Sequence, residues 1–430
     1  MSIYNPSRSS PSVPPEIWLQ IFRTATFIPG EWNVSATTSH PGLFPSWDAL
    51  QLGAYKAVLP LRRAIVQVSR LWWQIGCEVL YASFYETTSY YCAQTQTLGH
   101  FERSLLSRPV LGCLIKRLAL RWPRKGSSSK IDHILQLCPN TRILSFYHVV
   151  DPALHGPWES RILLNHVRVF DAAVYNLSQK CIVHVLSSLP NVEVLHLSGL
   201  KPGDEESRYH GTLRLPLVQF LSLSFNGDQG IEYWTPLLST ADIPRLTSLS
   251  TGLGKAPLPF SIGVWQRITF FNTLLGAYSA PKPEIFRSLT HLQLALEAQT
   301  FRHQQNHFPF HQLSHLTILY RSVQCYCVSQ WKQCVEVFLA LEMPLLKFVE
   351  LQWGDHGINS SLIWASGQER HLEAFLDYLE SLAHKFEQVG VQFQEARSRD
   401  IYHVPIPIKD AIRSARDKMA TGLELAFSAP

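Results

Sequence analysis

The sequence is poor in charged residues. Asp, Glu, Lys and Arg make up 17% of its 430 residues, whereas soluble domains average about 25%. Apolar residues reach 46%, which is enough to bury a large core in a chain of this length. So little charge is typical of a protein that acts within a complex, although a large internal sheet would lower the charged fraction in the same way.

Long apolar runs and long basic runs are also missing. No stretch of about 18 residues is apolar and free of charge, and the first residues are polar and rich in proline. We therefore expect neither a membrane span nor a secretory signal, and a cytoplasmic or nuclear location. The net charge of +5 is small, and no basic run stands out beyond residues 121–130. We therefore expect no nucleic-acid partner.

The sequence lacks the cysteine spacings of disulfide frameworks and zinc sites. Its eight cysteines show neither pairing nor density, so we expect them to be reduced. The residues that most resemble metal ligands are His303, His307, His311, His315, Cys325, Cys327 and Cys334. Pro309 prevents one continuous helix from carrying all four histidines, and Cys-x-Cys lacks the partner pair of a closed zinc site. We predict no metal site.

Catalytic and cofactor-binding motifs are missing too. The sequence has no Gly-x-Ser-x-Gly elbow, no glycine loop for phosphates and no His-Glu-x-x-His pair. The segment 252–255, Gly-Leu-Gly-Lys, is too short for a phosphate loop and is not followed by Ser or Thr. We therefore predict that the protein is not an enzyme and has no cofactor. One alternative stays open, because a triad assembled across distant repeats leaves no pattern in the sequence.

What the sequence does contain is a repeat. From residue 115 onward, an aliphatic residue is followed by two variable residues, an aliphatic residue, one variable residue and another aliphatic residue. The first six units are Ile115-Leu118-Leu120, Thr141-Leu144-Phe146, Leu164-Val167-Val169, Val192-Leu195-Leu197, Val218-Leu221-Leu223 and Leu246-Leu249-Thr251. Their middle positions are 26, 23, 28, 26 and 28 residues apart, within the range of about 20–29 for leucine-rich repeats. Looser units follow at Leu289-Leu292-Leu294, Leu313-Leu316-Ile318, Leu346-Val349-Leu351 and Phe386-Val389-Val391.

Each unit predicts one strand and one helix. The Leu-x-Leu core alternates between two faces, as a short strand does, and stretches such as 179–189 and 331–341 have helical periodicity. Prolines such as Pro190 open the units, because proline ends the preceding helix. The predicted fold is an irregular α/β leucine-rich-repeat solenoid, in which the strands form a curved parallel sheet with helices outside it.

The residues between the leucines form the predicted concave face. Arg117, Arg121 and Arg168 are outward positions of the first three units, and Glu350 is outward in a late unit. Because arginine pairs with carboxylates and phosphates through two hydrogen bonds, we predict that these arginines bind an acidic or phosphorylated segment of a target protein. The alternative is that they are ordinary solvated charges. The other outward positions are Ser145, His196, Ser198, Ser222, Ser224, Ser250, His291, Gln293, Thr317 and Gln352.

A second pattern lies near the start of the chain. Residues 13–22 read Val-Pro-Pro-Glu-Ile-Trp-Leu-Gln-Ile-Phe. Ser12 can act as an N-cap, Pro14 and Pro15 are tolerated only in a first helical turn, and Glu16 favours the positive end of the helix dipole. The apolar residues that follow at helical spacing are Ile17, Trp18, Ile21, Phe22 and Ala25. The pattern predicts an amphipathic docking helix.

A third pattern predicts a second apolar helix over residues 61–81. Apolar residues recur there with helical spacing, and those on one face are Ile65, Val68, Trp72, Ile75 and Val79.

Together, residues 12–85 resemble the F-box, the three-helix module by which a receptor subunit binds the Skp1 adaptor of a cullin-RING ubiquitin ligase. The Pro-Pro-Glu-Ile-x-x-x-Ile-Phe spacing matches the opening helix of that family, with Val13 where leucine is usual. Val68 and Trp72 match the family's Val-Cys-x-x-Trp element, with Ser69 in place of the cysteine. An insert at about 27–58 makes the module longer than the standard one, as in many F-box-like proteins of mushroom-forming fungi.

The resemblance implies a set of residues that contact a Skp1-like adaptor and, through it, a cullin. These are Pro14, Pro15, Glu16, Ile17, Ile21, Phe22, Val68 and Trp72. The alternative is a helical cap that covers the open end of the repeats and binds nothing. Exposure of Pro14, Pro15, Ile21 and Phe22 distinguishes the two, because a cap would bury these side chains against the first repeats.

The predicted domain organisation has four parts. They are a disordered N-terminus at 1–11, the F-box-like helical domain at 12–85, the leucine-rich-repeat solenoid at 86–405 and a helical tail at 406–430. A predicted helix at 371–384 lies at the end of the solenoid, and the helix of the tail is predicted at 408–427. The resemblance implies a substrate-recognition subunit of an SCF-type ubiquitin ligase, which holds an unknown target protein near a charged E2. The rival prediction is a non-catalytic leucine-rich-repeat scaffold without a ubiquitin role.

Overall fold

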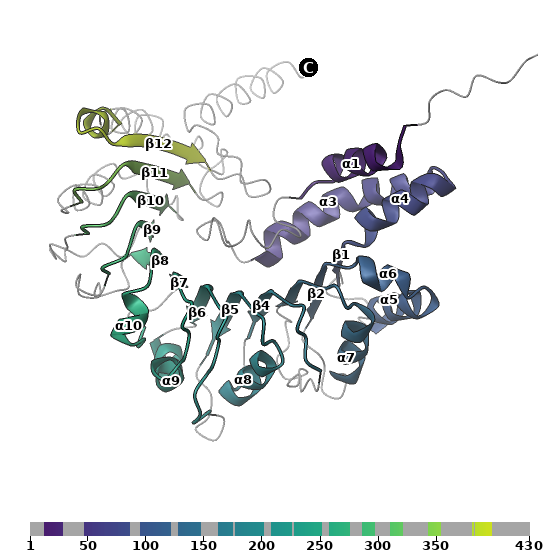
Figure 1. Ribbon diagram of the computed structural model, residues 1–430, viewed down its shortest axis with the longest axis horizontal. Helices are drawn as coiled ribbons and strands as arrows, with labels where there is room; N and C mark the ends of the chain where they lie inside the picture. The colour runs from purple at the N-terminus through teal and green to yellow at the C-terminus, as the bar shows by residue number, and fades with distance from the viewer. Residues whose placement is uncertain are drawn as a thin grey trace, which may run out of the picture.

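Twelve parallel strands form one curved sheet in the part of the chain that the structure describes. This computed structural model describes residues 13–28, 47–86, 95–121, 128–147, 162–174, 177–201, 208–225, 228–251, 258–275, 286–296, 310–320, 343–353, 381 and 383–397. The strands lie side by side in the order of the sequence, so the chain winds in one direction. Figure 1 shows the sheet bent into an arc. The predicted α/β fold with a curved parallel sheet is confirmed.

The strands are short and regular. They are β1 (Ser83–Tyr85), β2 (Arg117–Arg121), β3 (Ile143–Tyr147), β4 (Val169–Ala173), β5 (Val194–Leu200), β6 (Phe220–Phe225), β7 (Ser248–Thr251), β8 (Phe270–Leu275), β9 (His291–Leu296), β10 (His315–Tyr320), β11 (Phe348–Trp353) and β12 (Gln392–Arg397).

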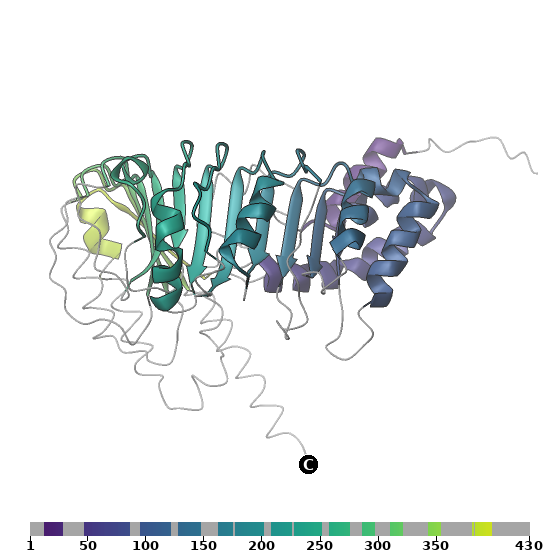
Figure 2. The same ribbon diagram turned by 90° about the horizontal axis from the view of Figure 1, so that it is seen from below.

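Helices lie outside the arc and at its N-terminal end. They are α1 (Pro15–Ala25), α3 (Trp47–Gln67), α4 (Arg70–Tyr81), α5 (Thr95–Ser107), α6 (Val110–Leu114), α7 (Ser128–Leu137), α8 (Gln179–Ser187), α9 (Asp228–Ser239) and α10 (Ile262–Trp265). Figure 2 views the sheet from its convex side, with helices lying in front of the strands. Helix α1 packs on α4, away from the sheet (Figure 1). Among the described residues, no helix is long and apolar enough to cross a membrane.

The core lies between the sheet and the outer helices. A row of in-register residues enters it from strands β2 to β7, namely Leu118, Leu144, Phe170, Leu195, Leu221 and Leu249, all buried. Burying a leucine or phenylalanine side chain contributes about 1.5–3 kcal/mol, so this row alone is a major source of stability. The predicted role of the repeated leucines in the core is confirmed.

The observed repeat is more regular than the predicted one because the sequence pattern missed strand β8. Phe271 of β8 pairs in register with Leu249 and Leu292, and it fills the long gap between those two units. The middle positions from β2 to β10 are therefore 26, 26, 25, 26, 28, 22, 21 and 24 residues apart. Strand β1, which precedes the first predicted unit, was also missed.

Two predicted units have the wrong register. In the third unit, the in-register residues are Phe170 and Ala172 rather than Val167 and Val169, because Val-x-x-Phe-x-Ala satisfies the same pattern three residues later. In the last unit, Phe393 rather than Val389 pairs with Val349. The predicted position, Val389, is 71% exposed in the turn before β12.

The predicted helix over residues 61–81 is two helices. Helix α3 ends at Gln67, and Ser69 caps α4 by accepting a hydrogen bond from the Trp72 backbone N–H at 3.1 Å. A capped start satisfies a backbone donor that a continuous helix would have used internally. Because the chain bends here, Val68 is 62% exposed and does not share a face with Ile65.

Helix α3 lies across the concave face of the first strands (Figure 1). Its Tyr55 packs against Tyr85 of β1 and Ala119 of β2, and the ring centroids of the two tyrosines are 4.4 Å apart. The stretch 27–58, predicted to be an insert between helices, therefore contributes the first half of α3 from Trp47 onward. Part of the predicted concave binding face is covered by the chain's own helix.

The predicted helix at 179–189 is observed as α8. Several other predictions lie outside the described residues: the disordered segment 1–11, the helix at 331–341 and the tail at 406–430. Of the predicted helix at 371–384, the described residues 381, 383 and 384 are helical.

Gly112 sets how closely α6 approaches the end of α7. A Cβ atom at this position would lie 1.9 Å from the carbonyl oxygen of Leu137, and backbone cannot rotate away. We expect Gly112→Ala to lower the free energy of unfolding by about 2 kcal/mol, the usual cost of overpacking. Chemical denaturation measures the change. Gly263→Ala is the control, because its nearest atom would be Arg267 Nη1 at 4.0 Å. Equal stability of the two variants would contradict this expectation.

Candidate functional site

Helix α1 begins two residues later than predicted, because its N-cap is Pro14 rather than Ser12. Pro14 occupies the N-cap position and Pro15 the first helical position, where the missing N–H costs no hydrogen bond. Glu16 lies in the first turn, where its carboxylate favours the positive end of the helix dipole. All three side chains are exposed. This end of α1 is therefore accessible, and no side chain caps it.

One face of α1 is used to hold it on α4. The ring centroids of Trp18 and Phe22 lie 4.7 Å and 4.8 Å from that of Trp72. Phe22 is 2% exposed and packs with Ile65 and Val79. The prediction that Phe22 contacts a partner is therefore wrong: its side chain fills the core between the helices. Trp72 is half-buried in the same cluster, so its ring also packs within the module.

The opposite face of α1 is apolar and exposed. Ile17 and Ile21 are four residues apart within α1, which places them in one stripe, and the exposed Val13 lies just before the helix. Their exposed fractions lie between 41% and 46%. Leaving such side chains in water forgoes about 25 cal/mol for each Å² of apolar area that packing would bury. This stripe is the surface that a binding partner would cover.

Exposed large apolar side chains concentrate on the same helices. Among the described residues, those between positions 13 and 81 are Val13, Ile17, Ile21, Phe27, Leu61, Val68, Leu71 and Trp73. Those in the rest of the described chain are Leu106, Val110, Leu163, Ile262, Leu345 and Val389. Single exposed apolar residues are common, whereas their accumulation on one module indicates an interaction surface.

Polar contacts fix these helices to one another and to the sheet. Glu78 of α4 forms an ion pair with Arg23 of α1 and lies 3.8 Å from the ammonium group of Lys116, at the start of β2. The buried guanidinium of Arg62 donates a hydrogen bond of 2.9 Å to the carbonyl oxygen of Thr26. The exposed stripe of α1 is therefore presented on a rigid base.

Helix α4 also closes the N-terminal end of the sheet. Cys77 belongs to the main core cluster of the solenoid, and a Cβ on Gly76 would lie 2.9 Å from a side-chain carbon of Ile65. Close packing on two sides leaves α4 little freedom to move. Helix α4 thus caps the sheet with one face, while α1 packs on another face of α4 and keeps its own apolar stripe exposed.

The three predicted target-binding arginines are not brought together. Arg117 is 1% exposed, with its guanidinium carbon 5.2 Å from the centroid of the Tyr85 ring. Arg168 lies in the turn before β4, because of the register shift, and pairs with Glu193 at 3.3 Å. Arg121 is half-buried at the end of β2. The prediction of a shared anion site on these residues is wrong.

Two buried titratable side chains near the sheet, Cys138 and His196, have strongly shifted pKa values. Burial, with a smaller contribution from Cys113, raises the pKa of the Cys138 thiol to about 12, which keeps it protonated and unreactive at neutral pH. Burial lowers the pKa of His196 to about 3. Asp171, His196 and Ser222 are in register on adjacent strands. A histidine with so low a pKa is a poor general base near neutral pH, so this row does not act as a triad.

Metal-ligand residues do not cluster in the described part of the chain. No group of three or more His, Cys, Asp or Glu side chains there could hold a metal ion. Of the predicted ligand-like residues, His303, His307 and the three cysteines at 325, 327 and 334 lie outside the described residues.

Comparison with known proteins adds no assignment. A scan against protein-family models and a search of curated proteins found no match.

Proposed function

We propose that this protein is the substrate-recognition subunit of an SCF-type ubiquitin ligase. Helix α1 and the corner between α3 and α4 bind a Skp1-like adaptor, which links the chain to a cullin, and the solenoid holds a target protein. The protein performs no bond chemistry itself. It raises the effective concentration of a target lysine near a charged E2.

The exposed stripe of α1 is the observation that carries this proposal. The Pro-Pro-Glu-Ile phrase resembles the opening helix of the F-box, and its residues Ile17 and Ile21 are exposed while Phe22 is buried. This division supports an adaptor site composed of Pro14, Pro15, Glu16, Ile17 and Ile21, to which the exposed Val68 adds. The buried Phe22 and the half-buried Trp72 support the site by holding α1 in place.

A scaffold without a ubiquitin role is the second candidate. The packing of Cys77 in the main core favours it, because this is the behaviour of a helix that only caps the sheet. Capping explains why α4 packs on the sheet, but it does not explain why the apolar stripe of α1 is exposed. The two candidates therefore differ in whether that stripe binds an adaptor.

A co-elution experiment tests the proposal. We expect the full-length chain to co-elute with a Skp1-like adaptor in size-exclusion chromatography, and the double variant Ile17→Glu/Ile21→Glu not to do so. Each substitution removes an apolar anchor worth about 1.5 kcal/mol, so the complex should be weakened roughly a hundred-fold.

The matched control is Leu163→Glu/Ile262→Glu. These side chains are 64% and 63% exposed on the solenoid, and the control adds the same charge. It should retain the adaptor. Absence of co-elution for the wild-type chain, while a known F-box protein binds the same adaptor, would refute the proposed function.

A further inference from the structure

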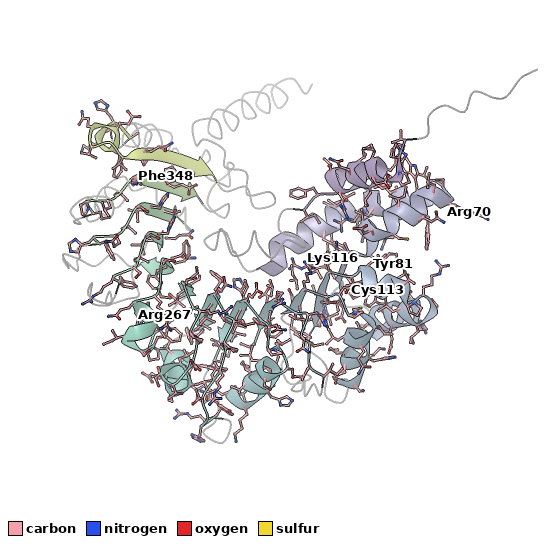
Figure 3. All side chains as sticks on the ribbon, in the orientation of Figure 1. Arg70, Tyr81, Cys113, Lys116, Arg267 and Phe348 are labelled. Atoms are coloured by element: carbon pink, nitrogen blue, oxygen red, sulfur yellow. The ribbon has the colours of Figure 1, made fainter. Side chains whose placement is uncertain are left out.

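The turns that lead into strands β7 to β11 carry a row of basic side chains, which we call the basic rim. Each of these turns carries one exposed cationic or potentially cationic side chain, and the five are Arg245, Arg267, Arg287, His311 and Lys347. Arg267 donates a hydrogen bond of 3.2 Å to the carbonyl oxygen of Ile243 in the preceding turn. Figure 3 shows Arg267 and Phe348 on the half of the sheet remote from Lys116 and the N-terminal helices.

Negative charge near this rim is sparse. In strands β7 to β11 and the turns before them, the carboxylates among the described residues are Asp242 and Glu350. Neighbouring strands lie about 4.8 Å apart, so the rim spans roughly 19 Å, which is the length of about six residues of extended chain. The rim therefore has the charge and the span to bind a short acidic segment.

An aromatic row on the concave face begins at the strand ends that follow the turns of the basic rim. Its members begin four adjacent strands in register: Phe270, His291, His315 and Phe348. The rings of His291 and His315 are stacked, with centroids 4.2 Å apart and planes at 12°. The His315 and Phe348 centroids are 5.7 Å apart. His291 is exposed and the other three are half-buried, so an incoming apolar side chain can contact this row.

A hydroxyl ladder fixes the histidine rings. The Thr290 hydroxyl donates to the Thr269 carbonyl oxygen at 3.1 Å, so it must accept the hydrogen bond that joins it to His291 Nδ1 at 2.9 Å. Ser314 and His315 repeat this arrangement one strand later. The neutral rings therefore carry their proton on Nδ1, and Nε2 gains an N–H donor only when the ring becomes a cation.

We propose that the basic rim and the aromatic row together bind an extended acidic segment of a target polypeptide that also carries an apolar side chain. The rim pairs with the carboxylates, and the row contacts the apolar side chain. The inference rests on the proposed function only in taking the bound polypeptide to be a ubiquitylation target. It places target recognition at β7 to β11, the end of the described sheet that α3 leaves open (Figure 1).

Fluorescence anisotropy with the full-length chain tests this site without any adaptor. The probe is a fluorescein-labelled peptide with three glutamates on either side of a phenylalanine, and the reference peptide has glutamines instead. We expect the variant Arg245→Ala/Arg287→Ala/Lys347→Ala to bind the glutamate peptide about ten-fold more weakly than the wild type. The charge-matched control is Lys56→Ala/Arg63→Ala/Arg142→Ala, all exposed and outside the rim. It should bind as the wild type does.

The outcomes separate this site from its rivals and from the adaptor site. If both triple variants lost affinity for the glutamate peptide equally, the loss would be due to the change in net charge alone, and the proposal would be overturned. Tighter binding of a labelled single-stranded hexanucleotide than of the peptide would assign the rim to nucleic acid instead. The rim variant should still co-elute with the adaptor, and the variant of Ile17 and Ile21 should still bind the peptide, so either failure can be recognised independently.

The histidine pair provides a second readout. Among the described residues of strands β8 to β11 and the turns before them, the other charged or titratable groups are members of the basic rim and Glu350, so an incoming carboxylate meets mainly positive charge. Burial, and then the charge of His315, lower the pKa of His291, and a bound carboxylate opposes both effects. We expect the glutamate peptide to bind about three-fold more tightly at pH 5.5 than at pH 7.5. This increase in affinity at low pH should be smaller in His291→Asn/His315→Asn. An unchanged increase would show that these rings are not part of the site.

Discussion

Replacing Leu221 with Asp is expected to disorder the middle of the solenoid. Leu221 is 1% exposed and lies in register between Leu195 and Leu249 in the main core. The substitution removes packing worth about 2–5 kcal/mol and adds a carboxylate whose burial costs several kcal/mol more. A total loss above about 5 kcal/mol is comparable to the whole stability of a typical domain.

The damage should spread beyond β6. Each strand is stabilised mainly by its neighbours in such an array, so hydrogen exchange should rise in β5 and β7 as well. The control is Ser224→Asp, which adds the same charge to a half-buried position of the same strand and should leave the array intact. Leu195→Asp should behave like Leu221→Asp. Unchanged melting temperatures for both leucine variants would show that the register described here is wrong.

Acid is expected to destabilise the fold through His196. Because burial holds the pKa of this side chain at about 3, against about 6.5 in an unfolded chain, the folded state binds fewer protons between these two values. Stability is therefore complete above about pH 6.5 and falls as the pH falls, by about 1.4 kcal/mol per unit. At pH 4 the loss from this one residue is about 3 kcal/mol.

Substitution isolates this contribution. Denaturation of the wild type and of His196→Gln at pH 7 and pH 4 should show a much smaller loss of stability in the variant, even if the variant is weaker at neutral pH. The exposed His311 provides the control, since His311→Gln should lose as much stability as the wild type. Parallel losses in the wild type and the His196 variant would contradict a buried neutral imidazole. Burial also lowers the pKa of His166, which adds a loss of the same sign to all three proteins.

The sequence predicted which residues form the core better than it predicted which residues lie on the exposed faces of the sheet and helices. Leucine at the repeat positions has one favourable place, which is the interior, so Leu195 and Leu221 identify their strands without any other information. The same rule fails where the repeat positions hold other residues. Strand β8 places Phe271 and Thr273 at these positions, and so it was missed. Consequently Arg267, in the turn before β8, could not be connected with the neighbouring arginines.

The exposed helix was predicted well because its signal is local. Proline at the first position, an acidic first turn and apolar residues four apart act within one helix, and α1 follows all of them. Phe22 and Arg117 were assigned wrongly for the opposite reason. Their burial depends on Trp72 and on α3, which are distant in sequence, and a face that looks exposed within one repeat can be covered by another segment.

Helix α3 can couple the free energies of binding at two separate surfaces. The same helix contacts the base of α1, where Arg62 binds the Thr26 carbonyl oxygen, and the concave strands, where Tyr55 meets Tyr85. Any ligand that shifts α3 at one end therefore changes the free energy of binding at the other. By thermodynamic reciprocity, an adaptor that changes the affinity for a ligand on the concave side of strands β1 and β2 would have its own affinity changed by the same factor when that ligand is bound.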